Sequence, residues 1–497
     1  MRYGFAYRSK LGLCAVMLVA TGCGGGSGSN FTSNNVSSFP PATVPLVKLS
    51  TDTFTNSTSQ HATEVEPDSF SFGSTIVAGF QVGRISTGGS SDIGFATSTD
   101  AGATWQNGFL PGLTTVQGGG ANAAVSDSAV VYDAKHGLWL ISSLTIASNG
   151  STQVVVSKSP DGMNWSNPVP VSHTPDPDKD WITCDNTPTS SFYGHCYLEW
   201  DDFQQNDLIY VSTSTDGGDT WASPLNPSGG ESAIGGQPLV QSNGTVIVPV
   251  LDFVRGIAAF TSIDGGASWS APMQVGTVVD RAVVGGLRSD ALPSAQIDGN
   301  GNVYIVWQDC SFRANCSSND LVMSTSADGI NWSARARIPI DATTSTVDHF
   351  IPGLGIDPTT GGSTAHLGLS YYYYPQANCS ASTCALYVGF ISSTDGGSTW
   401  STATPVAGPM TLSWLPSTTS GRMVGDYIAT SFAAGKAYGV FAVAKAKSGS
   451  TFDEAIYTTQ AGFDVAAAQA HNSSARELPA VAAKSRPNRS RTVRKIR

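Results

Sequence analysis

The eight residues Ser214–Trp221 read STDGGDTW, and closely related strings occur five more times along the chain. The other copies are Ser98–Trp105, Ser262–Trp269 and Ser393–Trp400, which have the same length, and Ser159–Trp165 and Ser326–Trp332, which are one residue shorter. Each copy follows an alternating apolar stretch, such as Leu208–Val211. Asp and Gly favour tight turns, where the carboxylate accepts backbone N–H bonds and the Trp ring covers the hairpin. The string therefore predicts a turn between two strands, made six times.

The spacing of these turns indicates how many units the chain holds. Successive turn aspartates lie 48 to 67 residues apart, so residues 45–462 have room for about seven units. The last unit lacks the string, and its three strand patterns begin at Asp426, Ala437 and Ala455. We expect Leu46–Phe54 to supply its fourth strand and so to join the two ends of the domain.

The six strings resemble the Asp-box, or bacterial neuraminidase, repeat. The resemblance covers about residues 60–460 and implies an all-β fold, a β-propeller of the sialidase type. In that family the boxes lie on the outer rim of the blades, far from the active site, so they indicate the fold and say little about function. The unit count favours seven blades, and six, the number in sialidases, is the alternative.

The N-terminus has the pattern of an export signal. Three basic residues within the first ten precede the apolar run Leu11–Ala20, which is about half the length of a membrane-spanning helix. The residues Ala20–Cys23 resemble a bacterial lipobox, which implies that a signal peptide, 1–22, is removed and that Cys23 carries lipid. An ordinary signal peptide is the alternative. We expect an exported protein that is lipid-anchored in the bacterial cell envelope, at the outer membrane or cell surface.

Charge divides the rest of the chain. Residues 23–44 are rich in Gly, Ser and Pro and suit a flexible tether, and 45–462 form the expected propeller. Residues 24–465 carry 15 basic and 36 acidic side chains, whereas the tail, 463–497, is basic and is expected to be disordered. A body this acidic repels nucleic acid and anionic lipid. We therefore expect a monomer whose membrane contact is the anchor alone.

The six cysteines of the body fall into three close pairs, each in a polar loop. The pairs are Cys184–Cys196, Cys310–Cys316 and Cys379–Cys384. Local pairing is the simplest arrangement, and it would staple surface loops in an oxidising compartment. No Cys-x-x-Cys pair with a matching His cluster is present, so no metal or other cofactor is expected. The alternating carboxylates of Asp176–Asp180 leave calcium as an alternative, although the Gly and Glu of a calcium loop are missing.

A polar residue precedes the first apolar strand of each unit. In chain order these are Glu66, Asp127, Asp178 with Asp180, Gln237, Arg288 with Asp290, Asp348 with His349, and Arg422 with Asp426. In a propeller the innermost strands begin around the axis, so these side chains are expected to meet at one channel mouth. The alternative is a solvated rim, because strand ends are commonly polar.

The resemblance also implies chemistry for this mouth. Sialidases hold the carboxylate of a sugar with three arginines and use a Tyr nucleophile with acidic partners. Carried over, Tyr427 is the nucleophile with Glu66, Asp180 and Asp426 as catalytic acids. The remaining residues become substrate ligands: Arg288, Arg422, His349, Asp127, Gln237 and Asp290. The family's Phe/Tyr-Arg-Ile-Pro signature is absent, and only Gly83–Ser86 stands near its place.

Three functions remain open at this point. The first is a glycoside hydrolase of the exo-α-sialidase type acting on glycans. The second is a non-catalytic propeller that binds glycan or protein on the cell envelope. The third is hydrolysis of a neutral polysaccharide by a carboxylate pair. Three arginines around Tyr427 would favour the first, and two facing carboxyl groups the third.

Overall fold

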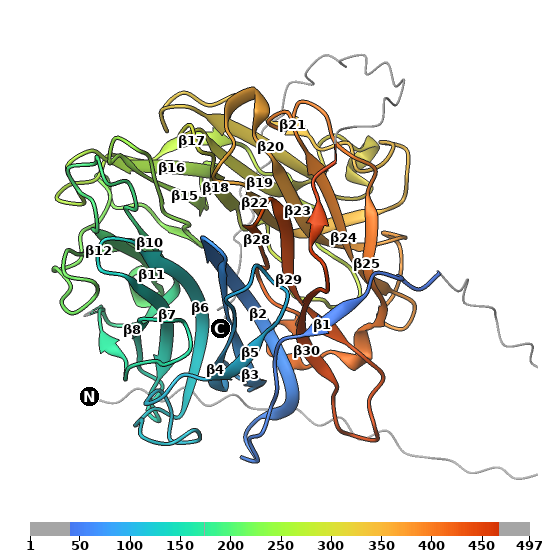
Figure 1. The fold of residues 1–497 in the computed structure, drawn as a ribbon. Helices are drawn as coiled ribbons and strands as arrows, with labels where there is room; N and C mark the ends of the chain where they lie inside the picture. The colour runs from blue at the N-terminus through green and yellow to red at the C-terminus, as the bar shows by residue number, and fades with distance from the viewer. Residues whose placement is uncertain (1–39, 173, 467–497) are drawn as a thin grey trace, which may run out of the picture. The chain divides into compact units, whose positions relative to one another are not determined.

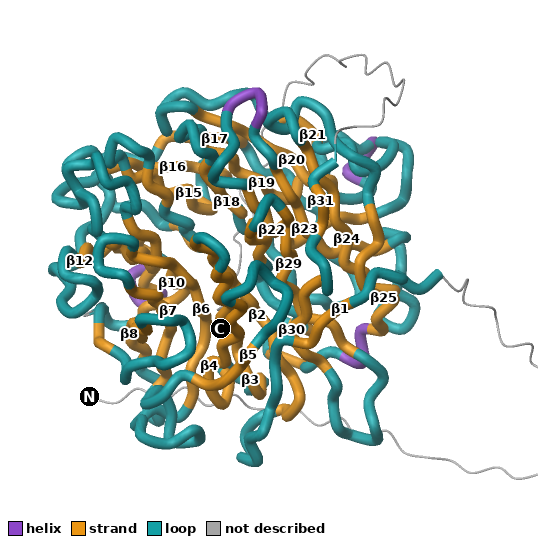
Figure 2. The backbone as a smooth tube through the Cα atoms, viewed as in Figure 1, coloured by secondary structure: helices purple, strands orange, loops and turns teal. Residues whose placement is uncertain are grey.

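The computed structural model describes residues 40–172 and 174–466. In this range the chain consists of β-strands joined by turns and loops, which confirms the all-β class (Figure 1). Its helical structure is limited to short 3-10 segments, drawn as isolated pieces in Figure 2: Phe203–Gln205, Ala314–Cys316, Gly362–Thr364 and Leu412–Trp414. Within the described range, no helix is long and apolar enough to cross a membrane. The expected signal peptide, Cys23 and the tail beyond residue 466 lie outside it.

Antiparallel strands follow one another in consecutive groups. The first three groups are β2 (Gln60–Phe72), β3 (Thr75–Arg84), β4 (Ser90–Ser98) and β5 (Gln106–Phe109); β6 (Ala124–Asp133), β7 (Leu138–Ile146), β8 (Thr152–Ser159) and β9 (Val169–Pro170); and β10 (Pro177–Cys184), β11 (Cys196–Asp202) and β12 (Leu208–Ser214). In all three, the STDGGDTW-type string begins at the last residue of the third strand. The turns thus lie where the sequence predicts them.

The next groups repeat this order. They are β13 (Ala233–Ile234), β14 (Leu239–Val240), β15 (Val246–Asp252), β16 (Gly256–Ser262) and β17 (Met273–Gly276); β18 (Ser294–Ile297), β19 (Val303–Asp309), β20 (Asp320–Ser326) and β21 (Ala336–Arg337); β22 (Asp348–Ile356), β23 (Leu367–Tyr374), β24 (Ala385–Ser393) and β25 (Thr404–Thr411); and β28 (Ala429–Ala433), β29 (Lys436–Ala444) and β30 (Glu454–Thr459). The short pair β26 (Ser417–Thr418) and β27 (Gly421–Arg422) precedes the last group, and β31 (Phe463–Asp464) pairs with β29.

The two ends of the described chain meet in one sheet. Strand β1 (Leu46–Lys48) pairs antiparallel with β30, with Val47 opposite Thr458. This pairing confirms that the segment after residue 45 supplies a strand to the last group. A single bridge between Thr63 and Glu454 then connects β30 to β2 of the first group. None of the described sheets closes on itself, so strand pairing alone does not count the blades.

The first strands of the groups meet at a common centre. Figure 1 shows the groups following one another around it in chain order. The strands that touch there, each contacting the next and the last contacting the first, are β2, β6, β10, β14, β18, β22 and β28. Apolar side chains fill the space between neighbouring groups: Val131 of β6 shares one buried core with Leu198 and Trp200 of β11. Burial of such side chains between sheets is the main stabilising force of this architecture.

The six turn strings share one hydrogen-bond pattern, illustrated by Asp100. Its carboxylate accepts bonds from Ser98 Oγ and from the backbone N of Thr104, both at 2.8 Å. The Thr104 hydroxyl bonds the second oxygen at 2.6 Å, and these bonds lower the pKa of the exposed Asp100 to about 2. The corresponding Ser-to-Asp bond recurs in the other five turns. The turn chemistry expected from the sequence is confirmed.

Candidate functional site

The inner strands contain bulges that direct charged side chains to the centre. In four of them the pairing register shifts beside a non-glycine residue with positive φ. These residues are Glu66 (53°), Asp127 (51°), Lys179 (53°) and Ile351 (49°). Left-handed backbone is costly for such residues, and bulges at this kind of position re-aim a side chain. Three of the four equivalent positions therefore present a charge, and the fourth presents isoleucine.

Lys179 lies among carboxylates from three other elements. Its Nζ is 2.5 Å from Asp426 Oδ2, 3.4 Å from Glu66 Oε1 and 3.8 Å from Asp127 Oδ1. All four side chains are at most 5% exposed. Burial alone would lower the pKa of Lys179, but the carboxylates, Asp426 foremost, outweigh it and raise that pKa above its ordinary value.

Arg288 binds the same aspartate. Its Nε donates to Asp426 Oδ1 at 2.7 Å, and its Nη2 contacts Oδ2 in a bidentate pair. Burial raises the pKa of Asp426, but Arg288 and Lys179 together hold it far below the ordinary value. We call Glu66, Asp127, Lys179, Arg288 and Asp426 the mouth cluster. It joins residues from four inner-strand regions and one long loop.

A second layer supports Glu66 from behind. Gln81 Nε2 contacts Glu66 Oε2, and Gln81 Oε1 accepts a 2.7 Å bond from Arg84 Nη1. Arg84 is wholly buried and also donates to the carbonyl of Gly89 at 3.1 Å. Arg84 is the last residue of β3, the second strand of the first group, which is later in the group than the arginine of the Phe/Tyr-Arg-Ile-Pro signature would lie. Sequence reasoning missed Gln81 and Lys179 as members of this network, and left Arg84 without a role.

Tyr427 follows the cluster directly and is held on both sides. Its hydroxyl accepts a 3.0 Å bond from the backbone N of Ser128, and its ring packs edge-on against Trp181 with centroids 5.1 Å apart. Burial raises its pKa well above the ordinary value, and the nearby carboxylates of Glu66 and Asp127 raise it further. Formation of a phenolate is therefore disfavoured in this state of the site.

The space beside the cluster is small. A cavity of about 20 Å³ is lined by side chains that include Lys179, Asp180, Trp181, Gln237 and Tyr427. That volume suits a water molecule, whereas pockets for drug-sized ligands are roughly 300–1,000 Å³. Asp180 is buried against this space, and burial raises its pKa well above the ordinary value. Gln237 is already engaged, because its Oε1 accepts a 2.7 Å bond from the backbone N of Ala295.

Two of the expected site residues lie apart from the cluster. His349 packs edge-on against Tyr371, and burial lowers its pKa to about 4. The inner-strand position equivalent to Glu66 in this group is Ile351, so His349 is out of phase by two residues. Arg422 donates from Nη1 to the carbonyl of Leu415 at 2.8 Å.

Asp290 and Asp348 complete the expected set. Asp290 lies within electrostatic range of Asp426 and Arg288, and burial is the main cause that raises its pKa. Asp348 accepts a 2.7 Å bond from the backbone N of Asn319 and lies 3.5 Å from Arg281. The structure therefore gathers most of the expected acids at the centre but leaves Asp348 with the loops of a neighbouring group.

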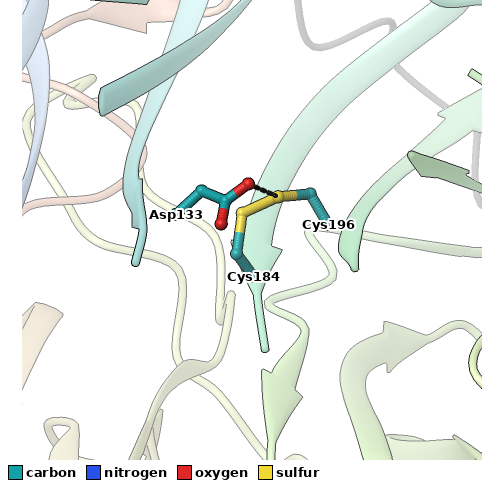
Figure 3. Close-up of side chains that lie close together, drawn as sticks. All are labelled: Asp133, Cys184 and Cys196. Carbon is teal, nitrogen blue, oxygen red and sulfur yellow. Dashed lines mark hydrogen bonds between the residues drawn. A yellow bond between two sulfur atoms is a disulfide. The ribbon is translucent and has the colours of Figure 1, made fainter. Parts of the chain in front are cut away.

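Two groups of side chains in the described range could in principle hold a cation. Asp133 lies against Cys184 and Cys196, with a sulfur-to-oxygen contact of 3.6 Å (Figure 3). Cys184 and Cys196 form a disulfide, so neither sulfur is a thiolate that could bind a metal. The other two expected cysteine pairs are also disulfides. The local pairing predicted from the sequence is confirmed.

The second group is an ion-pair network. Asp320 and Asp341 approach His349, but Arg313 and Arg337 already bind both carboxylates at 2.5–2.8 Å. A cation there would face two guanidinium groups. The carboxylates of Asp176–Asp180 do not gather into such a group in the described range, and Asp176 accepts a bond from Thr152 Oγ1 at 2.9 Å.

Comparisons with known proteins give distant structural neighbours. No family model and no curated protein matches the sequence. Among solved structures, the chain is similar to the Hadza microbial sialidase Hz136, with 18% identity, 63% of this chain and 64% of that chain covered, and a TM-score of 0.45. It is also similar to a leech intramolecular trans-sialidase (14%, 80% and 67%, TM-score 0.39) and to an ulvan lyase, a polysaccharide lyase (13%, 84% and 96%, TM-score 0.47). The match spans less than two thirds of the Hadza sialidase.

Proposed function

We propose that this chain is an exported, lipid-anchored propeller of seven blades that engages a glycan at the centre of the ring, over the buried mouth cluster. The observation that carries the proposal is the burial of five charged side chains from separate elements at one central point. Burying charge is costly, and a cluster of buried charges with perturbed pKa values at one point is a candidate functional site. Two observations support seven blades. Seven inner strands touch one another in sequence, and β1 adds a strand to the last group.

The geometry favours binding over sialidase catalysis. Asp426 already occupies both Arg288 and Lys179, the cations nearest the centre. The Tyr427 hydroxyl is hydrogen-bonded to the backbone of Ser128, and its phenolate is disfavoured. Arg288 is paired with Asp426, Arg84 with Gln81, and Arg422 with the carbonyl of Leu415, and these bonds do not favour a three-arginine grip on a sugar carboxylate. We therefore propose a glycan-binding propeller, with an exo-α-sialidase as the second candidate, supported by the position of Tyr427 beside the acids.

The test uses residues 24–497 as a purified protein. It is screened for turnover of aryl glycosides, including a sialoside, and for binding to a glycan panel. Tyr427→Phe keeps the ring contact with Trp181 and removes only the hydroxyl. We expect glycan binding without turnover in the wild type, and binding largely retained in the variant.

Asp216→Ala is the matched control, because it alters an outer turn and should leave glycan affinity unchanged. If the wild type hydrolyses the sialoside and Tyr427→Phe does not, the sialidase alternative would be established. Absence of both binding and turnover across the panel would refute the proposed function.

A further inference from the structure

We propose that Asp426 fills an anion-binding position with its own carboxylate, so that the mouth accepts uncharged or cationic sugars and rejects sugar acids. The evidence for the blocked anion position is the geometry of Lys179, Arg288 and Asp426. The preference for uncharged or cationic sugars also rests on the proposed function.

The cations around Asp426 have the arrangement expected for a bound carboxylate. Arg288 presents Nε and Nη2 to the two oxygens of Asp426, the bidentate geometry with which guanidinium recognises carboxylate ligands. Lys179 adds a third charge-assisted bond from the opposite strand group, at 2.5 Å. One carboxylate thus receives bonds from two cations, and a ligand carboxylate would need the same atoms.

The two cations reach this point independently of each other. Lys179 is in β10 and Arg288 lies in the loop between β17 and β18, whereas Asp426 precedes β28. Backbone bonds also fix Arg288, whose N donates to the carbonyl of Arg422 at 2.7 Å. A position built by separate elements is expected to keep its shape when the Asp426 side chain is shortened.

Both cations of the mouth cluster are already paired with its carboxylates. Lys179 faces Glu66, Asp127 and Asp426, and Arg288 is paired with Asp426. Burial first, and then the neighbouring Asp127, raises the pKa of Asp178 to about 8, so this carboxyl can hold a proton and donate to a hydroxyl. The other cation in electrostatic range, Arg84, is wholly buried behind Gln81. An incoming sugar acid would therefore find Lys179 and Arg288 already bonded to Asp426, whereas a neutral or amino sugar needs neither cation.

The test is Asp426→Ala in the full exported chain, with formate as the probe. Thermal unfolding is followed in sodium formate and in sodium chloride at equal ionic strength. We expect the variant to melt below the wild type in chloride, and formate to raise its midpoint by several degrees in a saturable way. The wild type should show no difference between the two salts. If the variant does not fold in chloride, the folded yield after refolding in formate or chloride replaces the midpoint.

Asp320→Ala is the matched control. Arg313 binds Asp320 in a similar buried bidentate pair, with Nε to Oδ2 at 2.8 Å, but it keeps Asp341 as a second carboxylate. We expect no formate-specific stabilisation there. Absence of the formate effect in Asp426→Ala, or an equal effect in Asp320→Ala, overturns the blocked anion position.

A sugar panel separates this inference from the proposed function. On wild-type protein we expect neutral or amino sugars to bind at least tenfold more tightly than a matched sugar acid, and Asp426→Ala to narrow or reverse that preference. Tighter binding of the sugar acid by the wild type overturns the sugar class. Formate rescue combined with no sugar binding by either protein supports the blocked position and refutes the glycan function.

Discussion

Replacing Glu64 by Gln should remove a large pH dependence of stability. Glu64 lies in β2 beside the joint between the first and last groups and is 1% exposed. One oxygen accepts a 2.7 Å bond from Ser50, and the other has no hydrogen-bond partner in the described structure. Burial is the main cause that raises its pKa from 4.5 to about 7, while Ser50 and Lys48 oppose the rise. Gln keeps the size and the acceptor for Ser50 but does not titrate.

The size of the effect follows from this shift. The folded protein holds the proton on Glu64 to a higher pH than the unfolded chain does. The contribution of this proton to the stability of the folded state is therefore complete below pH 4.5 and is lost as pH rises to about 7. The rise of the Glu64 pKa from 4.5 to about 7 corresponds to about 3 kcal/mol. Between these pH values, Glu64 should lower the wild-type free energy of unfolding by about 1.4 kcal/mol per pH unit.

The assay is denaturant unfolding of the wild type and Glu64→Gln between pH 4 and 8.5. We expect the free energy of unfolding of the variant, minus that of the wild type, to increase by about 3 kcal/mol across this range. Glu231→Gln is the control, because Glu231 pairs with Arg255 near the surface at 2.6 Å. Parallel pH curves for the wild type and Glu64→Gln would refute the reasoning, since the buried carboxyl would then not titrate between pH 4.5 and 7.

Three other predictions concern the centre, the rim and the anchor. Lys179→Met should lower the free energy of unfolding by about 3–5 kcal/mol at pH 7, because Glu66 and Asp127 lose the cation that they face, and acid should relieve part of the loss; a loss below about 1 kcal/mol in denaturant unfolding would contradict this. Asp216→Ala removes the bonds from Ser214 and Thr220 and should cost about 1–2 kcal/mol in the same assay, without changing glycan affinity. Cys23→Ser should abolish metabolic labelling by a fatty acid, and an unlabelled wild type would rule out lipidation.

Much of the outer structure is readable from the sequence because its determinants are local. A turn string such as Ser98–Trp105 contains the donors and the acceptor that close it, so its geometry follows from eight residues. The disulfides join cysteines at most 12 residues apart. The strand at Leu46–Lys48 is predictable because the last unit has only three strand patterns in the sequence, so a fourth strand has to come from elsewhere in the chain.

The centre is less predictable because its chemistry depends on bulges and on partners far away in sequence. An alternating pattern does not show that Lys179, rather than Asp180, takes the bulged position with positive φ. The same bulge selects Ile351 over His349 in another group. The pairing of Asp426 with Arg288 and Lys179 depends on side-chain directions across separate strands, and no single-sequence pattern contains that information.

The pairing of β1 with β30 also dictates when the fold can be completed. Val47, near the start of the body, pairs with Thr458, near its end, so the joint closes over nearly the whole of the described chain. Contacts this distant in sequence are slow to form. Until the last residues have emerged, the groups already formed have an open edge at each end, and such edges promote association between chains. The period between the synthesis of residue 47 and that of residue 458 is therefore the time when the chain most needs protection from association with its own copies.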